Sequence, residues 1–177
     1  MARFFWSMAK SDSFFIRASA TMNGATEVQT GIDLGAYVDA LGKSVLRIHN
    51  IAVRYDFGST GPAIQVANGE CGGFFQLTTQ SQANLVPATD RSVISTGQIH
   101  ATNATASPNQ YTFYSDSLDV APQHWRNGYL VGVEQIYLLV QSNGNGFTTD
   151  PRVEIVMECT VETLSQAAAM ALSLSQQ

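Results

Sequence analysis

Three histidines and two cysteines are the residues of this sequence most able to do chemistry. No two of His49, His100 and His124 lie three to five residues apart, the spacing at which a helix or a zinc finger presents a metal-binding pair. The sequence therefore predicts no metal site and no cofactor. Cys71 and Cys159 are too few for a disulfide scaffold, so we expect two separate buried thiols.

Nucleophilic catalysis has little support. A Ser-His-Asp triad has no fixed order along the chain, so the sequence does not test for one. No Gly-x-Ser-x-Gly elbow occurs. The stretch Gly69–Gly73 could expose Cys71 among flexible glycines, but we favour a tight turn followed by a core cysteine. We expect a protein that is not an enzyme, with no catalytic residues.

Glycoside hydrolysis would need a pair of carboxylates. Glu154, Glu158 and Glu162 alternate along one predicted strand and share its outer face, and Glu134 lies on a neighbouring strand. We interpret these glutamates as a solvated strand face.

A cluster of aromatic residues keeps a second function open. Trp125, together with Tyr129, Tyr111 and Tyr114, could form a platform on which sugars stack, although core and interface aromatics are more common. The alternative function is therefore a β-sandwich carbohydrate-binding or adhesion module.

Charge is scarce in this chain. Of its 177 residues, 13% are Asp, Glu, Lys or Arg and 45% are hydrophobic; a typical soluble domain is about 25% charged. The net charge is −5 and the nine basic residues do not cluster, so we expect no strong direct binding to nucleic acid. No apolar run reaches the roughly 18 residues that a membrane span needs.

Alternating hydrophobic residues predict about eight strands. These are Phe14–Met22, Lys43–Phe57, Ala63–Ala67, Phe74–Thr79, Ser92–Thr102, Gln110–Leu118, Tyr129–Gln141 and Pro151–Thr163. The second is long for a strand, so we expect a bulge or bend near His49–Asn50. Glycines break the pattern over Thr30–Gly42, where we expect a crossing loop with a short helical turn.

This order of elements predicts an all-β fold. Strands that do not alternate with long helices exclude a doubly wound fold and favour an eight-stranded two-sheet β-sandwich. Its long connections indicate the jelly-roll type. An immunoglobulin-like sandwich comes second, because the Cys-Trp-Cys spacing of that fold is absent. We divide the chain into an N-terminal arm (1–12), a jelly-roll domain (13–163) and a C-terminal helix or tail (164–177).

Both ends of the chain are apolar. The arm contains Phe4, Phe5 and Trp6, and it is too short to be read as a secretory leader. The tail changes to a helical period, with Leu164, Ala167, Ala168, Ala171, Leu172 and Leu174 on one side. Because its polar side has almost no charge, we expect this helix to dock on its own domain or on a neighbour.

The arrangement of the predicted strands resembles the single jelly-roll capsid proteins of tailless icosahedral viruses. The resemblance rests on the early strand, the glycine-broken loop Ile32–Gly42, the long strand Val45–Phe57 and the two long C-terminal strands. It implies a structural virion protein that packs as homo-oligomeric capsomers into a closed shell, with termini that reach across to neighbouring subunits. The expected interface residues are Phe4, Phe5, Trp6, Leu164, Met170, Leu172 and Leu174.

The arm departs from this family in one respect. Many capsid proteins of RNA viruses have a basic arm, whereas this arm has only Arg3 and Lys10. In a shell protein, contact with the genome would then be weak, or left to another virion component such as an internal membrane or a separate protein.

Overall fold

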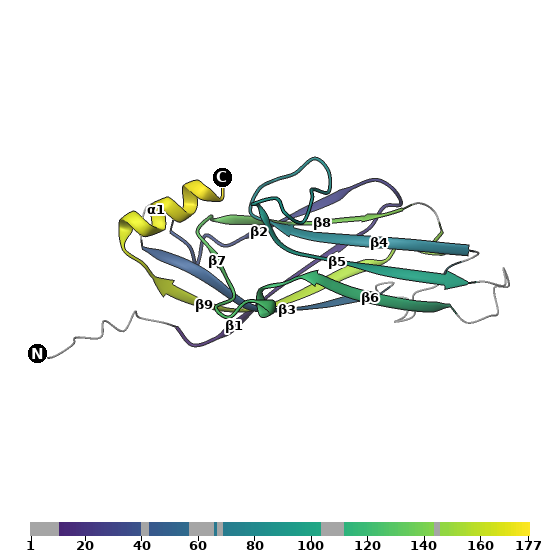
Figure 1. Cartoon of the computed structure of the whole chain (residues 1–177), viewed down its shortest axis with the longest axis horizontal. Helices are drawn as coiled ribbons and strands as arrows, with labels where there is room; N and C mark the ends of the chain where they lie inside the picture. Colours follow the sequence, from purple (N-terminus) through teal and green to yellow (C-terminus); the bar gives the residue numbers. More distant parts are fainter. Residues whose placement is uncertain (1–10, 40–42, 57–65, 67–68, 104–111, 144–145) are drawn as a thin grey trace, which may run out of the picture.

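The computed structural model describes residues 11–39, 43–56, 66, 69–103, 112–143 and 146–177. These residues form two β-sheets packed face to face, with one helix at an end of the sandwich (Figure 1). The elements are β1 (Phe14–Thr21), β2 (Val28–Asp33), β3 (Ser44–Asp56), β4 (Gly69–Thr78), β5 (Val93–Asn103), β6 (Phe113–Val120), the short 3-10 helix η2 (Pro122–His124), β7 (Tyr129–Val131), β8 (Gln135–Ser142), β9 (Arg152–Thr163) and α1 (Gln166–Ser175). The all-β sandwich with a C-terminal helix is confirmed.

The strand order is that of a jelly roll. One sheet has the order β1-β9-β3-β7 and the other β2-β8-β4-β5-β6. The hydrogen-bonded pairs β1–β9, β2–β8, β3–β7 and β4–β5 are all antiparallel and are nested in the sequence, as in a long hairpin that has been rolled up. Strand β6 is added outside β5. The described residues form nine strands where eight were expected, because β2 was not expected and one predicted strand is divided into β7 and β8.

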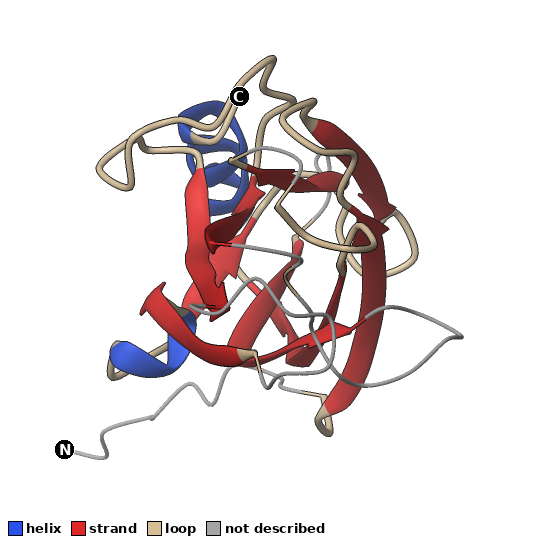
Figure 2. Cartoon of the chain, turned by 90° about the vertical axis from the view of Figure 1, so that its right-hand side faces the viewer, coloured by secondary structure: helices blue, strands red, loops and turns tan. Residues whose placement is uncertain are grey.

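The core lies between the two sheets, and the strands enclose it when the molecule is viewed from one end (Figure 2). Strand β9 shows how the sequence pattern builds it. Val153, Ile155, Met157 and Cys159 alternate with the less buried Glu154, Val156 and Glu158, point inward and are at most 1% exposed. These residues form one face because a period of two places every second side chain on the same side of a strand.

The bulge in the long strand is also confirmed. Strand β3 pairs with β9 along its whole length, and the register shifts between Ile48 and Asn50. The extra residue, His49, has its ring Nε2 2.9 Å from the Thr160 hydroxyl. A bulge bends and twists a strand locally, which lets a strand of 13 residues follow a curved sheet.

Two predicted connections are wrong. Residues Val28–Asp33 form the edge strand β2, where a loop was expected; only the helical turn that follows it, with the Val38 amide donating to the Leu34 carbonyl, was predicted. The single strand expected over Tyr129–Gln141 is two strands, β7 and β8, which lie in opposite sheets. The chain crosses between the sheets at residues 132–134, so a continuous apolar run belongs to two different elements.

The glycine-rich stretch Gly69–Gly73 is also part of a strand and not a turn. A Cβ on Gly73 would lie only 2.7 Å from the Met22 side chain, so the missing side chain lets β4 pack closely against its neighbours. Of the predicted strand Ala63–Ala67, only Val66 lies within the described residues, where it forms an isolated bridge with Phe147. Nowhere in the described part of the chain is there a helix long and apolar enough to cross a membrane.

Candidate assembly surfaces

The helix α1 is attached to its own domain through a narrow face. Ala169 and Ser173 are its buried residues, and the C-cap residue Gln176 is buried as well, each at most 5% exposed. Ser165 begins the helix as its N-cap, with its hydroxyl accepting a hydrogen bond from the Ala168 amide at 3.3 Å. The prediction that the helix docks is confirmed for its own domain, although the docked face contains two polar residues.

Gln176 is buried because it forms hydrogen bonds with the backbone at the edge of β7, beside which the end of α1 lies. The Gln176 side chain accepts a hydrogen bond from the Gly132 amide at 2.8 Å and donates one to the Leu130 carbonyl at 2.7 Å. The Gln176 backbone carbonyl also accepts a hydrogen bond from the Thr79 hydroxyl at 3.0 Å. Since Leu130 lies in β7 of one sheet and Thr79 follows β4 of the other, the end of α1 joins the two sheets.

The opposite face of α1 is apolar and open. Leu174 is 67% exposed and Met170 is 44% exposed, and the neighbouring Ala167 and Ala171 are exposed as well. No charged residue occurs from Thr163 to Gln177. We call Ala167, Met170, Ala171 and Leu174 the outer face of α1; large exposed hydrophobic groups that lie together commonly mark a contact with another protein.

The predicted interface residues therefore separate into three groups. Met170 and Leu174 are exposed on the outer face of α1. Leu164 and Leu172 are half-buried, and Leu172 packs over Gly132, where a Cβ would lie 2.9 Å from the Leu172 Cγ. Phe4, Phe5 and Trp6 lie outside the described residues.

The histidines do not come together as a catalytic or metal-binding group. His49 lies in β3, His100 in β5 and His124 in η2, and the ring of His100 is 3.8 Å from the exposed Glu70 carboxylate. Among the described residues there is no group of three or more His, Cys, Asp and Glu side chains able to hold a metal ion.

The glutamates of β9 have separate partners. Glu162 points to the outer face, yet its side chain is only 5% exposed, because Arg47 binds it through two nitrogens at 2.7 and 2.8 Å. Glu154 pairs with Arg152. The interpretation of these residues as a solvated strand face is therefore wrong for Glu162, which is buried under the Arg47 side chain.

The two thiols are buried and free, as predicted. Burial raises the pKa of Cys159 to about 12 and also raises the pKa of Cys71. The Cys71 Sγ donates a hydrogen bond to the Asn143 side chain at 3.3 Å. Because the thiolate is the nucleophile, neither cysteine has the environment of a reactive thiol.

Trp125 forms part of a smaller aromatic surface. Its ring is 42% exposed and is tilted by 40° against Tyr129, with 6.0 Å between the ring centres. Tyr111 and the side chain of Tyr114, the other members of the predicted sugar platform, lie outside the described parts. Two aromatic rings at this angle do not present one flat face for stacking.

Comparison with known proteins was made by sequence and by structure. No protein-family model and no curated protein matches the sequence. Solved structures that are similar to it include a chain of Desmodium yellow mottle tymovirus (TM-score 0.39, 8% identity, 92% of each chain covered). A second is VP1 of Trichodysplasia spinulosa-associated polyomavirus, solved with GM1 oligosaccharide (TM-score 0.41, 12% identity, 85% of this chain and 95% of that chain covered). A third is Cocksfoot mottle virus (TM-score 0.37, 11% identity, 92% of this chain and 100% of that chain covered). The similar solved structures are those of viruses. The jelly-roll fold that the sequence predicted is confirmed by the order of the strands in the two sheets.

Proposed function

We propose that the protein is a structural subunit that assembles with copies of itself into a closed shell, as the capsid protein of a virion. The observation that carries the proposal is the outer face of α1, where Met170 and Leu174 are exposed on an uncharged helix at the end of the sandwich. Long-lived interfaces between subunits are apolar and exclude charge in their centres.

The composition supports an assembly more than a free monomer. With 13% charged residues, the chain has few groups to keep an exposed surface in solution, whereas soluble domains have about 25–35% charged residues on their surface. Exposed positions on α1 are Ala, Ser, Gln, Met and Leu. Such a surface is stable when neighbouring subunits cover it.

The same composition limits the partners. Nine basic residues against fourteen acidic ones give a net charge of −5, whereas neutralising a genome needs an excess of clustered basic residues. We therefore expect the subunit to contact itself first and nucleic acid weakly, with other virion proteins or an internal membrane in between. We assign it no catalytic role.

The test is the mass of the full chain in solution, by light scattering after size exclusion, with negative-stain images of the same fractions. We expect uniform, closed particles in the megadalton range. A stable monomer of 19.1 kDa at high protein concentration would contradict the proposal, and glycan binding through Trp125 would become the leading alternative.

A further inference from the structure

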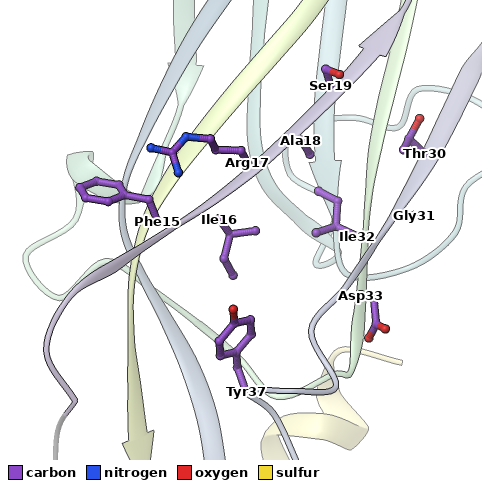
Figure 3. A pocket seen from close by; sticks show the side chains of 10 residues that line it. All are labelled: Phe15, Ile16, Arg17, Ala18, Ser19, Thr30, Gly31, Ile32, Asp33 and Tyr37. Atoms are coloured by element: carbon purple, nitrogen blue, oxygen red, sulfur yellow. The ribbon is translucent and has the colours of Figure 1, made fainter.

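A groove runs between the free edges of β1 and β2, the outermost strands of the two sheets on one side of the sandwich (Figure 3). Its volume is about 510 Å³. It is lined by five consecutive residues of β1, Phe15–Ser19, and four of β2, Thr30–Asp33. Tyr37, stacked on Phe14 with ring centres 4.7 Å apart, borders one end.

The core is incomplete along this groove. Ile16 and Ala18 face inward from β1 but are only half-buried. Their partners across the ladder, Met157 and Ile155 of β9, are at most 1% exposed. One further layer of apolar side chains would cover Ile16 and Ala18 as fully as the core residues beside them.

The backbone of β1 also lacks a neighbouring strand along this groove. Among the described strands, β1 pairs with β9 only, so its other edge offers free N–H and C=O groups to the groove. A free edge next to an apolar floor is the arrangement that accepts an added strand: the backbone of an extended segment pairs with the edge, and alternate side chains enter the groove.

We propose that this groove binds residues 4–8 of a second copy of the chain, as a strand added to the edge of β1; the inference rests on the proposed function, since it requires subunits that meet. The segment has the pattern that the site needs. In an extended strand, Phe4, Trp6 and Met8 point to one side, and Phe5 and Ser7 point to the other. Phe4, Trp6 and Met8 enter the groove and cover Ile16 and Ala18.

The hydrogen bonds of Ser11 keep Trp6 and Met8 of the subunit's own arm out of the groove. Ser11 is fixed to Val161 by two hydrogen bonds, from the Ser11 amide at 3.0 Å and to the Ser11 hydroxyl at 2.8 Å, so the arm can turn back only before Ser11. The tightest hairpin, a two-residue turn at Ala9–Lys10, sets Trp6 opposite Ser13. Trp6 and Met8 then stop short of the groove, which begins at Phe15, and of the three apolar residues only Phe4 reaches it, opposite Phe15.

A second copy is not limited in this way. Extended at about 3.3 Å per residue, the ten residues before Ser11 reach about 33 Å from the domain to which they belong. That distance is enough for Phe4, Trp6 and Met8 to lie along a neighbouring β1.

The experiment uses the full chain with two new cysteines, Trp6→Cys and Ala18→Cys. Chains grown in normal and in heavy nitrogen are mixed in equal amounts while unassembled, then assembled and oxidised, and the linked peptides are weighed by mass spectrometry. We expect a disulfide between the thiols introduced at positions 6 and 18, in which about half of the pairs join a light and a heavy chain, because partners mix at random. The native thiols are buried and do not compete.

The matched control is Phe5→Cys with Ala18→Cys, whose arm cysteine points away from the groove; its yield of mixed links should be several-fold lower. Links that are only light–light or heavy–heavy would overturn the inference in favour of the subunit's own arm. Absence of the link would also overturn it. If the native chain forms closed particles but the link is absent or forms only within one copy, the groove proposal is wrong and the proposed function stands. If the native chain forms no particles, both are wrong.

Discussion

Gln176 pairs with Gly132 as a neighbouring strand would. Its side-chain carbonyl accepts a hydrogen bond from the Gly132 amide at 2.8 Å, and its NH₂ group donates to the Leu130 carbonyl at 2.7 Å. One side chain therefore satisfies two backbone groups at the edge of β7 that no strand covers, and it fastens the helix to that edge.

The first prediction concerns this contact. Replacing Gln176 by Leu keeps the size of the side chain but leaves the Leu130 carbonyl and the Gly132 amide without their partner, which should cost about 1–3 kcal/mol. Urea unfolding should show this loss, and hydrogen exchange should show α1 opening. Gln166→Leu, in the exposed first turn, is the control and should leave the free energy of unfolding within about 0.5 kcal/mol.

The second prediction uses the close approach of α1 to Gly132. An added Cβ would lie 2.9 Å from the Leu172 Cγ and 3.2 Å from the Ser173 amide nitrogen. Gly132→Ala should therefore displace the helix and cost about 1–3 kcal/mol, as overpacking does. Adding Leu172→Ala removes the nearer contact and should recover part of the loss; a double variant no more stable than Gly132→Ala would show that Leu172 does not limit the space.

The third prediction tests the outer face of α1. The double variant Met170→Ser, Leu174→Ser replaces its two large apolar side chains, both exposed, so the folded subunit should lose little stability. The protein concentration at half-assembly should rise at least tenfold, which corresponds to about 1.4 kcal/mol per subunit. Light scattering across a dilution series gives that concentration.

The control for this face is Gln166→Ser, a polar exchange in the first turn of the same helix. It should assemble as the native chain does. If the Met170, Leu174 double variant also assembles at the native concentration, α1 is not the interface.

The fourth prediction concerns the ion pair beneath the outer surface of β9. Glu162→Gln keeps the shape of the side chain but leaves the guanidinium of Arg47, whose side chain is 18% exposed, without its carboxylate. Removing one partner of a buried pair costs about 3 kcal/mol. Arg47→Met combined with Glu162→Leu should cost less than Glu162→Gln alone, because no charge is left buried, and urea unfolding of the two variants compares them.

The fifth prediction is a loss of stability in alkali. Burial raises the pKa of Cys159 to about 12 in the folded chain, while the unfolded thiol titrates near its ordinary value of about 8.5. The folded state therefore holds its proton over a pH range in which the unfolded state releases it. The contribution of the protonated Cys159 thiol to the free energy of unfolding is complete below about pH 8.5. It is lost as the pH rises toward 12, by up to about 1.4 kcal/mol per pH unit.

The measurement is urea unfolding of the native chain and of Cys159→Ala at several values between about pH 8 and pH 11, the range between the two pKa values of the thiol. The slope of stability against pH should be smaller in the variant. Burial also raises the pKa of Tyr55, so part of the slope should remain. Equal slopes in the two proteins would mean that the Cys159 thiol does not contribute.

Much of the sandwich could be predicted because its strands alternate clearly. Val153, Ile155 and Met157 identify the inward face of β9, and the length of β3 required the bulge beside His49. Strand β2 was missed because its Gln29, Thr30 and Gly31 have no apolar alternation, and an edge strand with one exposed side does not need it.

The surfaces were harder to predict than the strands. Met170 and Leu174 could be found, since a helix without charge exposes whatever it does not dock. The docked face could not, because it depends on Gln176 meeting the edge of β7, which is 44 residues away in the sequence. The groove between β1 and β2 could not be predicted either: it exists only because two edge strands of different sheets lie on the same side of the sandwich.

The nesting of the strand pairs decides when the domain can form during synthesis. Strand β9 lies between β1 and β3, so the four-stranded sheet has a gap at its centre until residues 152–163 have left the ribosome. The other sheet has all five of its strands once β8 is made. Since α1 follows β9, its outer face appears after all nine described strands, and a growing chain offers that face to a partner only after its own sheets are able to close.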